Sequence, residues 1–177
     1  MRLRPHHLLD IITDYGHGVE FRPHPYGHAV HIVAAQVLAN LDLEVRFVLA
    51  ADEICRPCQH LRSDGQCGDV LHQLGEPISK QAYNDALDRR LFSYFGMRPG
   101  DKMTWMSTSM RVRTFLEKVN EHTPGVEKVC THPGEKEKDR LEGLEKGLTR
   151  LGFRERQGAD NSGPDGSSCA PAWQPEG

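Results

Sequence analysis

The chain has 177 residues, the size of one ordinary domain, and its 22 basic and 25 acidic side chains give a net charge of −3. This balance argues against a strongly basic nucleic-acid surface, and no apolar run approaches the roughly 18 residues that a membrane span needs. The N-terminal segment lacks the apolar core of a signal peptide, so we expect a cytoplasmic protein with reduced thiols. Five cysteines and ten histidines then stand out as candidate ligands.

The first half of the chain predicts two helices followed by a strand. A short N-terminal helix opens at Pro5, which has no N–H to satisfy, and is ended by Gly16 and Gly18. The segment 28–40 is apolar on nearly all faces and predicts a buried helix. Alternating apolar and charged residues over 43–49 give the best strand signal in the chain.

The second half predicts helices and a tail, which makes the fold class α+β, a mainly helical domain with a small β-sheet around a metal site. Helical spacing of apolar residues predicts further helices over 79–95, 107–120 and 135–153. A leucine stripe in the last helix favours packing on its own domain, with a dimer seam as the alternative. The composition then changes to Gly, Ser, Pro and Asp, so we expect a folded domain over 1–156 and a flexible tail over 157–177.

Three cysteines, Cys55, Cys58 and Cys67, form a C-x2-C-x8-C pattern. A two-residue spacer lets a tight turn aim the first two sulfurs inward, Pro57 stiffens that turn, and Gly65 lets the chain return for the third. Three thiolates held this closely repel one another unless a cation neutralises them, so the pattern predicts a metal centre. Three sulfurs are one short of a closed zinc site or a fully cysteine-ligated cluster.

The fourth ligand must come from elsewhere in the chain, unless that position is open. The candidates are Asp10, His6, His7, His60, Cys130 and His132. Because neighbouring residues project in different directions from a helix, we expect at most one of His6 and His7 to face the site. The roles of Cys130, His132 and Cys169 are otherwise unassigned.

A thiol–disulfide redox protein is a further interpretation of the first two cysteines. A strand followed by Cys55-Arg56-Pro57-Cys58 at the start of a helix imitates the thioredoxin arrangement, in which the helix N-terminus lowers the thiol pKa. Two observations count against this interpretation. Cys67 is unneeded in such a scheme, and no second βαβ unit follows.

Two short blocks of the sequence resemble a known family. They are RPHHLL at 4–9 and DEICRPCQHL at 52–61, the second followed by GQC at 65–67. Over about residues 1–120 the chain resembles the domain of unknown function 1284 family. These are small bacterial and archaeal proteins to which an iron–sulfur cluster is ascribed and which have no settled activity. The resemblance implies a [4Fe–4S] cluster as cofactor.

The chain departs from the family pattern at Asp10, where the family usually has a cysteine. The resemblance implies Asp10, Cys55, Cys58 and Cys67 as the ligand set. Aspartate is a harder donor than a thiolate, so the change breaks the cluster, converts the site toward zinc, or leaves one iron available to a substrate. We favour a retained cluster, with Asp10 as a labile or open fourth position, and keep a structural zinc-binding module as the alternative.

Three histidines, His24, His28 and His31, are spaced four and three residues apart. On a helix this spacing puts them on one face, where they could meet one ion or one anionic substrate. The leading hypothesis is therefore a non-redox enzyme of the lyase or hydrolase type. These histidines would hold a small anionic substrate beside the cluster and move a proton. No nucleic-acid or membrane partner is expected.

Overall fold

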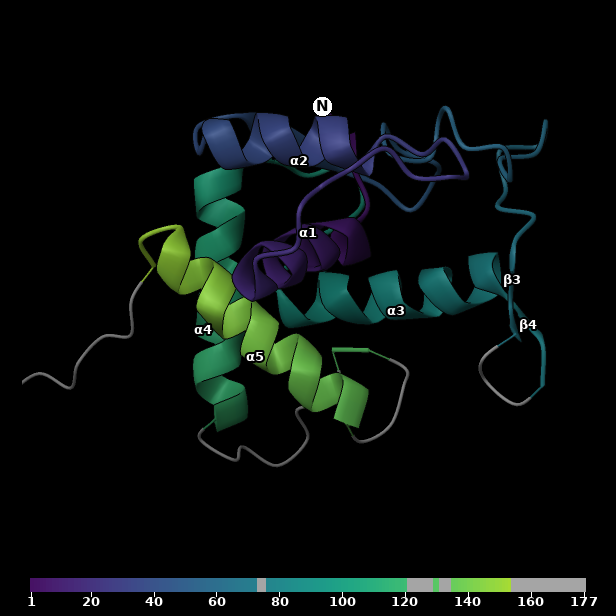
Figure 1. The fold of residues 1–177 in the computed structure, drawn as a ribbon. Helices are drawn as coiled ribbons and strands as arrows, with labels where there is room; N and C mark the ends of the chain where they lie inside the picture. The colour runs from purple at the N-terminus through teal and green to yellow at the C-terminus, as the bar shows by residue number, and fades with distance from the viewer. Residues whose placement is uncertain (73–75, 121–128, 131–134, 154–177) are drawn as a thin grey trace, which may run out of the picture.

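The computed structural model describes residues 1–72, 76–120, 129–130 and 135–153. The predicted tail over 157–177, with Cys169, lies outside these residues. The same is true of His132 and of the predicted domain boundary at 156. The described chain forms helices and small sheets, which confirms the α+β class (Figure 1).

The central element of the fold is α1 (Pro5–His17), which the other helices surround (Figure 1). Pro5 stands in its first turn as predicted, and Gly18 closes its C-terminus with a φ of 74°. Gly16 does not end the helix but is buried within it. The helix therefore extends further than the glycines suggested, because Gly16 serves close packing against another helix.

The described strands are β1 (Arg2–Leu3), β2 (Glu44–Phe47) and β5 (Lys102–Thr104) in one sheet, and β3 (Val70–Leu71) and β4 (Ile78–Ser79) in a second. The central strand β2 pairs with β1 in parallel and with β5 in antiparallel orientation. Val45 and Phe47 are fully buried, whereas Glu44 and Arg46 are exposed. The alternation read over 43–49 is thus confirmed as a strand with one face on the core.

The remaining described helices are α2 (Val30–Ala39), α3 (Lys80–Tyr94), α4 (Trp105–Asn120) and α5 (Glu135–Arg150). Each of the four begins within two residues of the start that the sequence predicts. The Ser79 hydroxyl caps α3 by accepting a hydrogen bond from Ala82 N. The prediction of a buried α2 was wrong in part: Ile32 is 52% exposed, because only one face of the helix meets the core.

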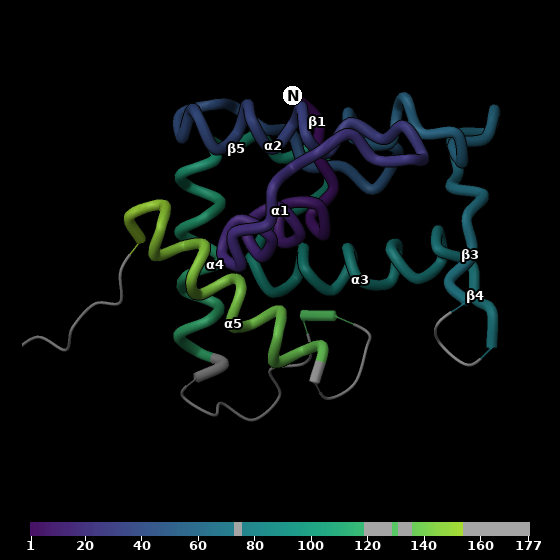
Figure 2. The backbone as a smooth tube through the Cα atoms, viewed as in Figure 1, coloured from purple at the N-terminus to yellow at the C-terminus, as the bar shows by residue number. Residues whose placement is uncertain are grey.

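Helices α1 and α5 pack against each other and cross at glycines (Figure 2). A Cβ on Gly16 would lie 1.9 Å from the backbone oxygen of Gly143, and one on Gly147 would lie 2.1 Å from that of Ile12. Leu144 of the leucine stripe is fully buried at the same contact. The stripe therefore packs on its own domain, as favoured from the sequence.

Two loops lie side by side at one end of α1 (Figure 2). One joins α1 to α2 and the other follows β2 and contains the cysteines. Main-chain hydrogen bonds connect them, from Ala29 N to Ile54 O at 3.0 Å and from Gln59 N to Tyr26 O at 2.9 Å. The histidines of the first loop and the cysteines of the second are consequently held beside each other.

Candidate metal centre

A cavity of about 620 Å³ opens between α1, α3, α5 and the two loops. The four residues predicted as ligands, Asp10, Cys55, Cys58 and Cys67, all line it. Asp10 comes from α1 and the cysteines from the loop after β2, so the fold brings together groups that are far apart in the sequence. Their binding of a metal stays a prediction.

The cysteine loop is shaped by its own short-range hydrogen bonds. Cys58 N donates to Cys55 O at 2.9 Å, which is the tight turn expected from the two-residue spacer. Gly65 adopts a φ of 77°, and the strand-like bridge between Leu61 and Cys67 then returns the third cysteine to the first two. All three thiols are partly buried.

Asp52 anchors this loop to α1 and has no solvent exposure. One carboxylate oxygen accepts hydrogen bonds from Ile54 N and Cys55 N, each at 3.0 Å. The other accepts from Arg4 N at 2.7 Å and lies 2.7 Å from His7 Nδ1. Burial alone would raise the pKa of Asp52, but His7 and these N–H donors hold it well below its usual range.

Asp88 of α3 makes a second buried junction with the start of α1. Its carboxylate accepts hydrogen bonds from Arg4 Nε at 2.6 Å and from His6 N at 2.8 Å. It also lies 2.9 Å from His6 Nδ1. Arg4 also contacts Asp85 Oδ1 at 2.5 Å. Asp88 is fully buried, so these bonds replace all of its hydration. The first residues of α1 are thereby fixed to both walls of the cavity.

His6 and His7 both line the cavity, and their ring centroids are 4.2 Å apart. The expectation that at most one of them would face the site was therefore wrong, because the side-chain carboxylates of Asp88 and Asp52 turn both rings. Burial lowers the pKa of His6, aided by the charge of His7. For His7, the attraction of Asp52 outweighs burial and raises the pKa.

Asp10 is held by an arginine from α5. Its Oδ1 lies 2.6 Å from Arg140 Nη2. Although burial by itself raises the pKa of Asp10, Arg140 and the neighbouring His6 lower it below the usual range. Asp14, one turn further along α1, lines the same cavity, and burial next to Asp10 raises its pKa to about 6. Arg140 and the histidines thus favour the charged form of Asp10, whereas burial disfavours the charged form of Asp14.

The histidines at 24, 28 and 31 do not share a helix face. His24 and His28 lie in the loop before α2, with stacked rings 3.8 Å apart between centroids, and both line the cavity. His31 belongs to α2 and is not part of the cavity wall. The helical-spacing argument failed because α2 begins only at Val30. A turn at Pro25 and Tyr26 brings the first two rings together instead.

Donor atoms that lie close together mark candidate metal sites. In the described part of the chain, two groups have three donor atoms within 4.8 Å of one another: His6–His7–Asp10 and His7–Asp52–Cys55. Neither group holds two of the cysteines, although all three cysteines of the block line the same cavity.

The surroundings of Cys55 do not suit the reactive thiol of a redox dithiol. Burial, together with the charge of Asp52, raises the pKa of Cys55 to about 12. A thioredoxin-like dithiol needs the opposite shift, and residues 55–69 form turns and a bridge in place of the helix that would supply it. Lys80 lies on the cavity wall near Cys58 and Cys67, where its Nζ forms an ion pair with Asp69 at 2.9 Å.

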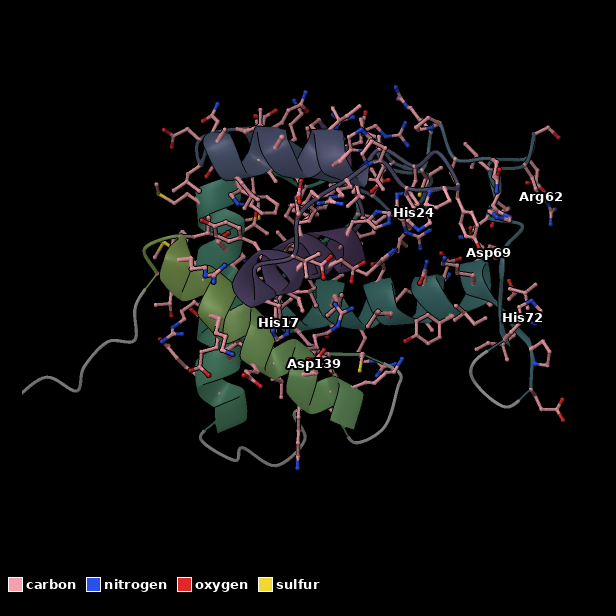
Figure 3. The ribbon with its side chains drawn as sticks, in the orientation of Figure 1. His17, His24, Arg62, Asp69, His72 and Asp139 are labelled. Atoms are coloured by element: carbon pink, nitrogen blue, oxygen red, sulfur yellow. The ribbon has the colours of Figure 1, made fainter. Side chains whose placement is uncertain are left out.

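The other cysteine and histidine candidates are placed as follows. Cys130, which lies outside the C-x2-C-x8-C pattern, is buried and lines the cavity. His60 packs edge-on against Tyr26, with centroids 4.4 Å apart. His72 lies out on the β3–β4 hairpin, far from His24, and His17 reaches toward α5, where its Nε2 lies 3.4 Å from Asp139 (Figure 3).

Comparison with known proteins adds no relative. No protein-family model, no curated protein and no solved structure matches the chain. The resemblance at 4–9 and 52–61 therefore rests on those two blocks alone. Of the helices in the described ranges, none is long and apolar enough to cross a membrane. The functional argument accordingly depends on the geometry of the cavity.

Sequence reasoning missed the residues that orient the ligands. Asp52 was noted only as the first residue of the 52–61 block, with no role of its own. Asp88 and Arg140 carried no local signal, because their partners on α1 are 82 and 130 residues away. The one usable hint was the pair of adjacent histidines directly after Arg4 and Pro5. Histidines held against a core need hydrogen-bond partners, and here Asp88 and Asp52 supply them.

Proposed function

We propose that this protein binds a [4Fe–4S] cluster on Cys55, Cys58 and Cys67 and uses it in non-redox chemistry on a small anionic substrate. The observation that carries the proposal is the convergence of the three thiols on one cavity, whose wall holds more histidines and basic side chains than carboxylates. The donor set fits, since the three thiols are partly buried, lie in a loop shaped by its own hydrogen bonds and line one cavity. The resemblance in the two sequence blocks supports the same cofactor.

When bound, such a cluster supplies a Lewis acid at the iron that lacks a cysteine ligand. The chain's own residues prepare for this charge. Asp52 fixes the turn at Cys55 through two backbone N–H groups, and Lys80 offsets the negative charge of the thiolates. The fourth position is left to Asp10, as a labile ligand, or to the substrate.

Unpaired polar atoms on the wall indicate the substrate class. Within the described residues, the buried atoms Thr13 Oγ1, His28 Nδ1 and Arg140 Nη1 have no hydrogen-bond partner, and all three residues line the cavity. A buried donor without a partner costs about 1–3 kcal/mol, so a ligand rich in acceptor oxygens would relieve that cost. Carboxylates and phosphates are such ligands. The substrate role of the predicted histidines narrows to His24 and His28.

The test is anaerobic isolation of the full chain with iron, sulfide and zinc analysis. We expect a brown protein with about four iron and four sulfide per chain. Cys58→Ser should lose most of both, because it removes one of the three sulfur ligands. Cys130→Ser is the matched control, since Cys130 lines the same cavity outside the block, and it should retain the cluster.

Two results would contradict the proposal. A colourless protein without iron and sulfide, holding one zinc that Cys58→Ser loses, would support the structural zinc module instead. Full retention of iron in Cys58→Ser would show that the block is not the ligand set. Circular dichroism of each variant separates loss of the cluster from loss of the fold.

A further inference from the structure

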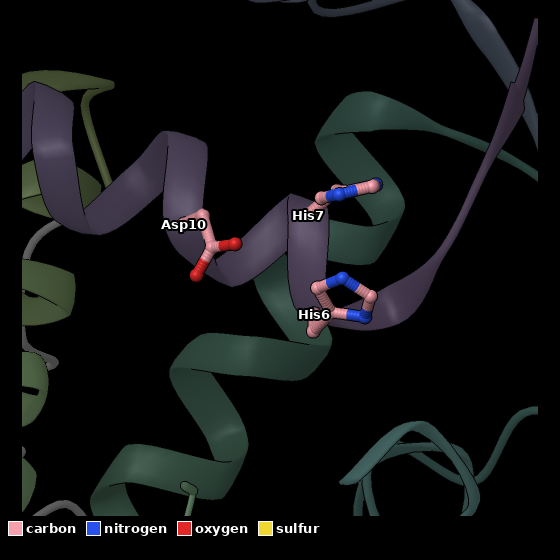
Figure 4. Close-up of side chains that lie close together, drawn as sticks. All are labelled: His6, His7 and Asp10. Atoms are coloured by element: carbon pink, nitrogen blue, oxygen red, sulfur yellow. The ribbon is translucent and has the colours of Figure 1, made fainter. Parts of the chain in front are cut away.

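The first turns of α1 present three potential ligands side by side (Figure 4). Asp10 follows His6 by four residues and His7 by three, so helical geometry puts the three on neighbouring positions. One donor atom from each lies within 4.8 Å of the others. All three residues line the cavity. This group contains no thiol and is therefore chemically distinct from the cysteine loop.

Each of these side chains is oriented by a partner of opposite character. His6 Nδ1 lies 2.9 Å from Asp88 and His7 Nδ1 lies 2.7 Å from Asp52, and both carboxylates are fully buried. A ring that gives its Nδ1 proton to a carboxylate presents the Nε2 lone pair to a cation. Arg140 Nη2 takes one oxygen of Asp10 at 2.6 Å, which leaves the other oxygen to a ligand.

This is the arrangement that surrounds ligands in metal sites. Histidines that bind metals are usually held by a carboxylate on the other ring nitrogen, and ligating carboxylates are themselves hydrogen-bonded. Two histidine–carboxylate pairs with fully buried carboxylates next to a third carboxylate are a costly structure for packing alone, because an apolar core would need none of these groups. The supporting partners come from three separate segments, the loop at 52, α3 and α5.

We infer that His6, His7 and Asp10 bind a divalent transition-metal ion, such as Zn²⁺ or Fe²⁺, at a site that adjoins the cysteine loop but has no cysteine ligand. Two imidazoles and one carboxylate are a donor set that suits these ions. Three protein ligands leave coordination positions free, and these face the cavity, where water or an acceptor oxygen of a substrate can take them. The inference goes beyond the proposed function and assigns Asp10 to this ion, leaving the cluster's fourth position open.

The decisive experiment titrates Co²⁺ into the full chain as isolated, and into the Cys55→Ser/Cys58→Ser/Cys67→Ser variant. We expect one equivalent to bind in both proteins, with weak visible bands and no intense thiolate-to-cobalt absorption. Asp10→Asn should weaken Co²⁺ binding at least tenfold, because even supporting partners are worth that much. Asp14→Asn, which alters the next carboxylate along α1 on the same wall, should leave it unchanged.

Nuclear magnetic resonance of the imidazole nitrogens in the unmutated protein gives a reading that does not depend on any variant folding. Zn²⁺ should shift the Nε2 resonances of His6 and His7 while their Nδ1 atoms stay protonated. Intense thiolate absorption that disappears in the triple cysteine variant, or equal affinity in the Asp10 and Asp14 variants, would overturn the inference. The cluster proposal is tested apart from this, by the iron and sulfide content of the isolated protein.

Discussion

Replacing Asp88 with alanine is expected to lower the free energy of unfolding of the metal-free protein by about 3–5 kcal/mol, the usual cost of removing one partner of a buried ion pair. The carboxylate is fully buried and receives Arg4 Nε, His6 N and the His6 ring. Its removal leaves the guanidinium of Arg4, which is itself buried, with a single partially exposed partner at Asp85.

Urea unfolding followed by circular dichroism measures this loss, with Asp85→Ala as the matched control. Asp85 contacts the same arginine but is 22% exposed, so its removal should cost well under half as much. A loss below about 1 kcal/mol for Asp88→Ala would show that the junction is far weaker than its geometry indicates.

The stability lost in Asp88→Ala should also depend on pH. Burial would raise the pKa of Asp88, but His6 and Arg4 lower it below the usual range. A carboxyl group with a lowered folded-state pKa adds stability above its unfolded-state pKa, and this is lost as the pH falls through the folded-state value. The difference in unfolding free energy between wild type and Asp88→Ala should therefore be largest near neutral pH and shrink in acid.

Gly147→Ala is expected to destabilise the fold by about 2 kcal/mol or more, since overpacking typically costs about 1–3 kcal/mol. The new Cβ would lie 2.1 Å from the backbone oxygen of Ile12, and backbone atoms of a central helix cannot move aside. The helix-propensity gain of alanine, about 0.5–1 kcal/mol, does not offset this. Moving α5 away from α1 also displaces Arg140 from Asp10.

Gly143→Ala, one turn earlier on α5, is the control for Gly147→Ala in thermal unfolding. Its Cβ would meet side-chain atoms of His17 and Thr13 at 2.6 Å, and the partly exposed His17 ring can swing outward. The propensity gain is the same, so the smaller expected loss isolates the backbone contact. Equal stability of the two variants would contradict the close crossing of α1 and α5.

The predicted elements were recovered from the sequence because their signals are local. The alternation at Val45 and Phe47, the Ser79 cap and the leucine stripe of α5 each depend on neighbouring residues only. Gly16 was misjudged as a helix end, since a glycine that permits close packing and one that stops a helix look alike in a single sequence. The exposed side of α2 was hidden for a related reason: nothing local reveals which apolar face lacks a neighbour.

The sequence predicted that the three cysteines would lie in one loop, but it did not reveal the residues that orient the histidines. The C-x2-C-x8-C pattern describes a loop that closes on itself, so its geometry follows from spacing. The orientation of His6 and His7 depends on Asp88 and Asp52, whose positions only the tertiary fold determines. The His24–His28 pair was found by a helical argument that does not apply, and it is the turn before α2 that stacks the two rings.

The separate origins of the two groups of donors bear on how the protein matures in the cell. The turn at Cys55–Cys58 and the bridge at Leu61–Cys67 form through contacts within about a dozen residues, and loops of that size close in well under a microsecond. The group on α1 exists only after α3, α5 and the cysteine loop have docked, which requires contacts across 82 and 130 residues. A nascent chain could therefore capture iron or zinc on its thiols early, while occupancy of the α1 group would report completed folding.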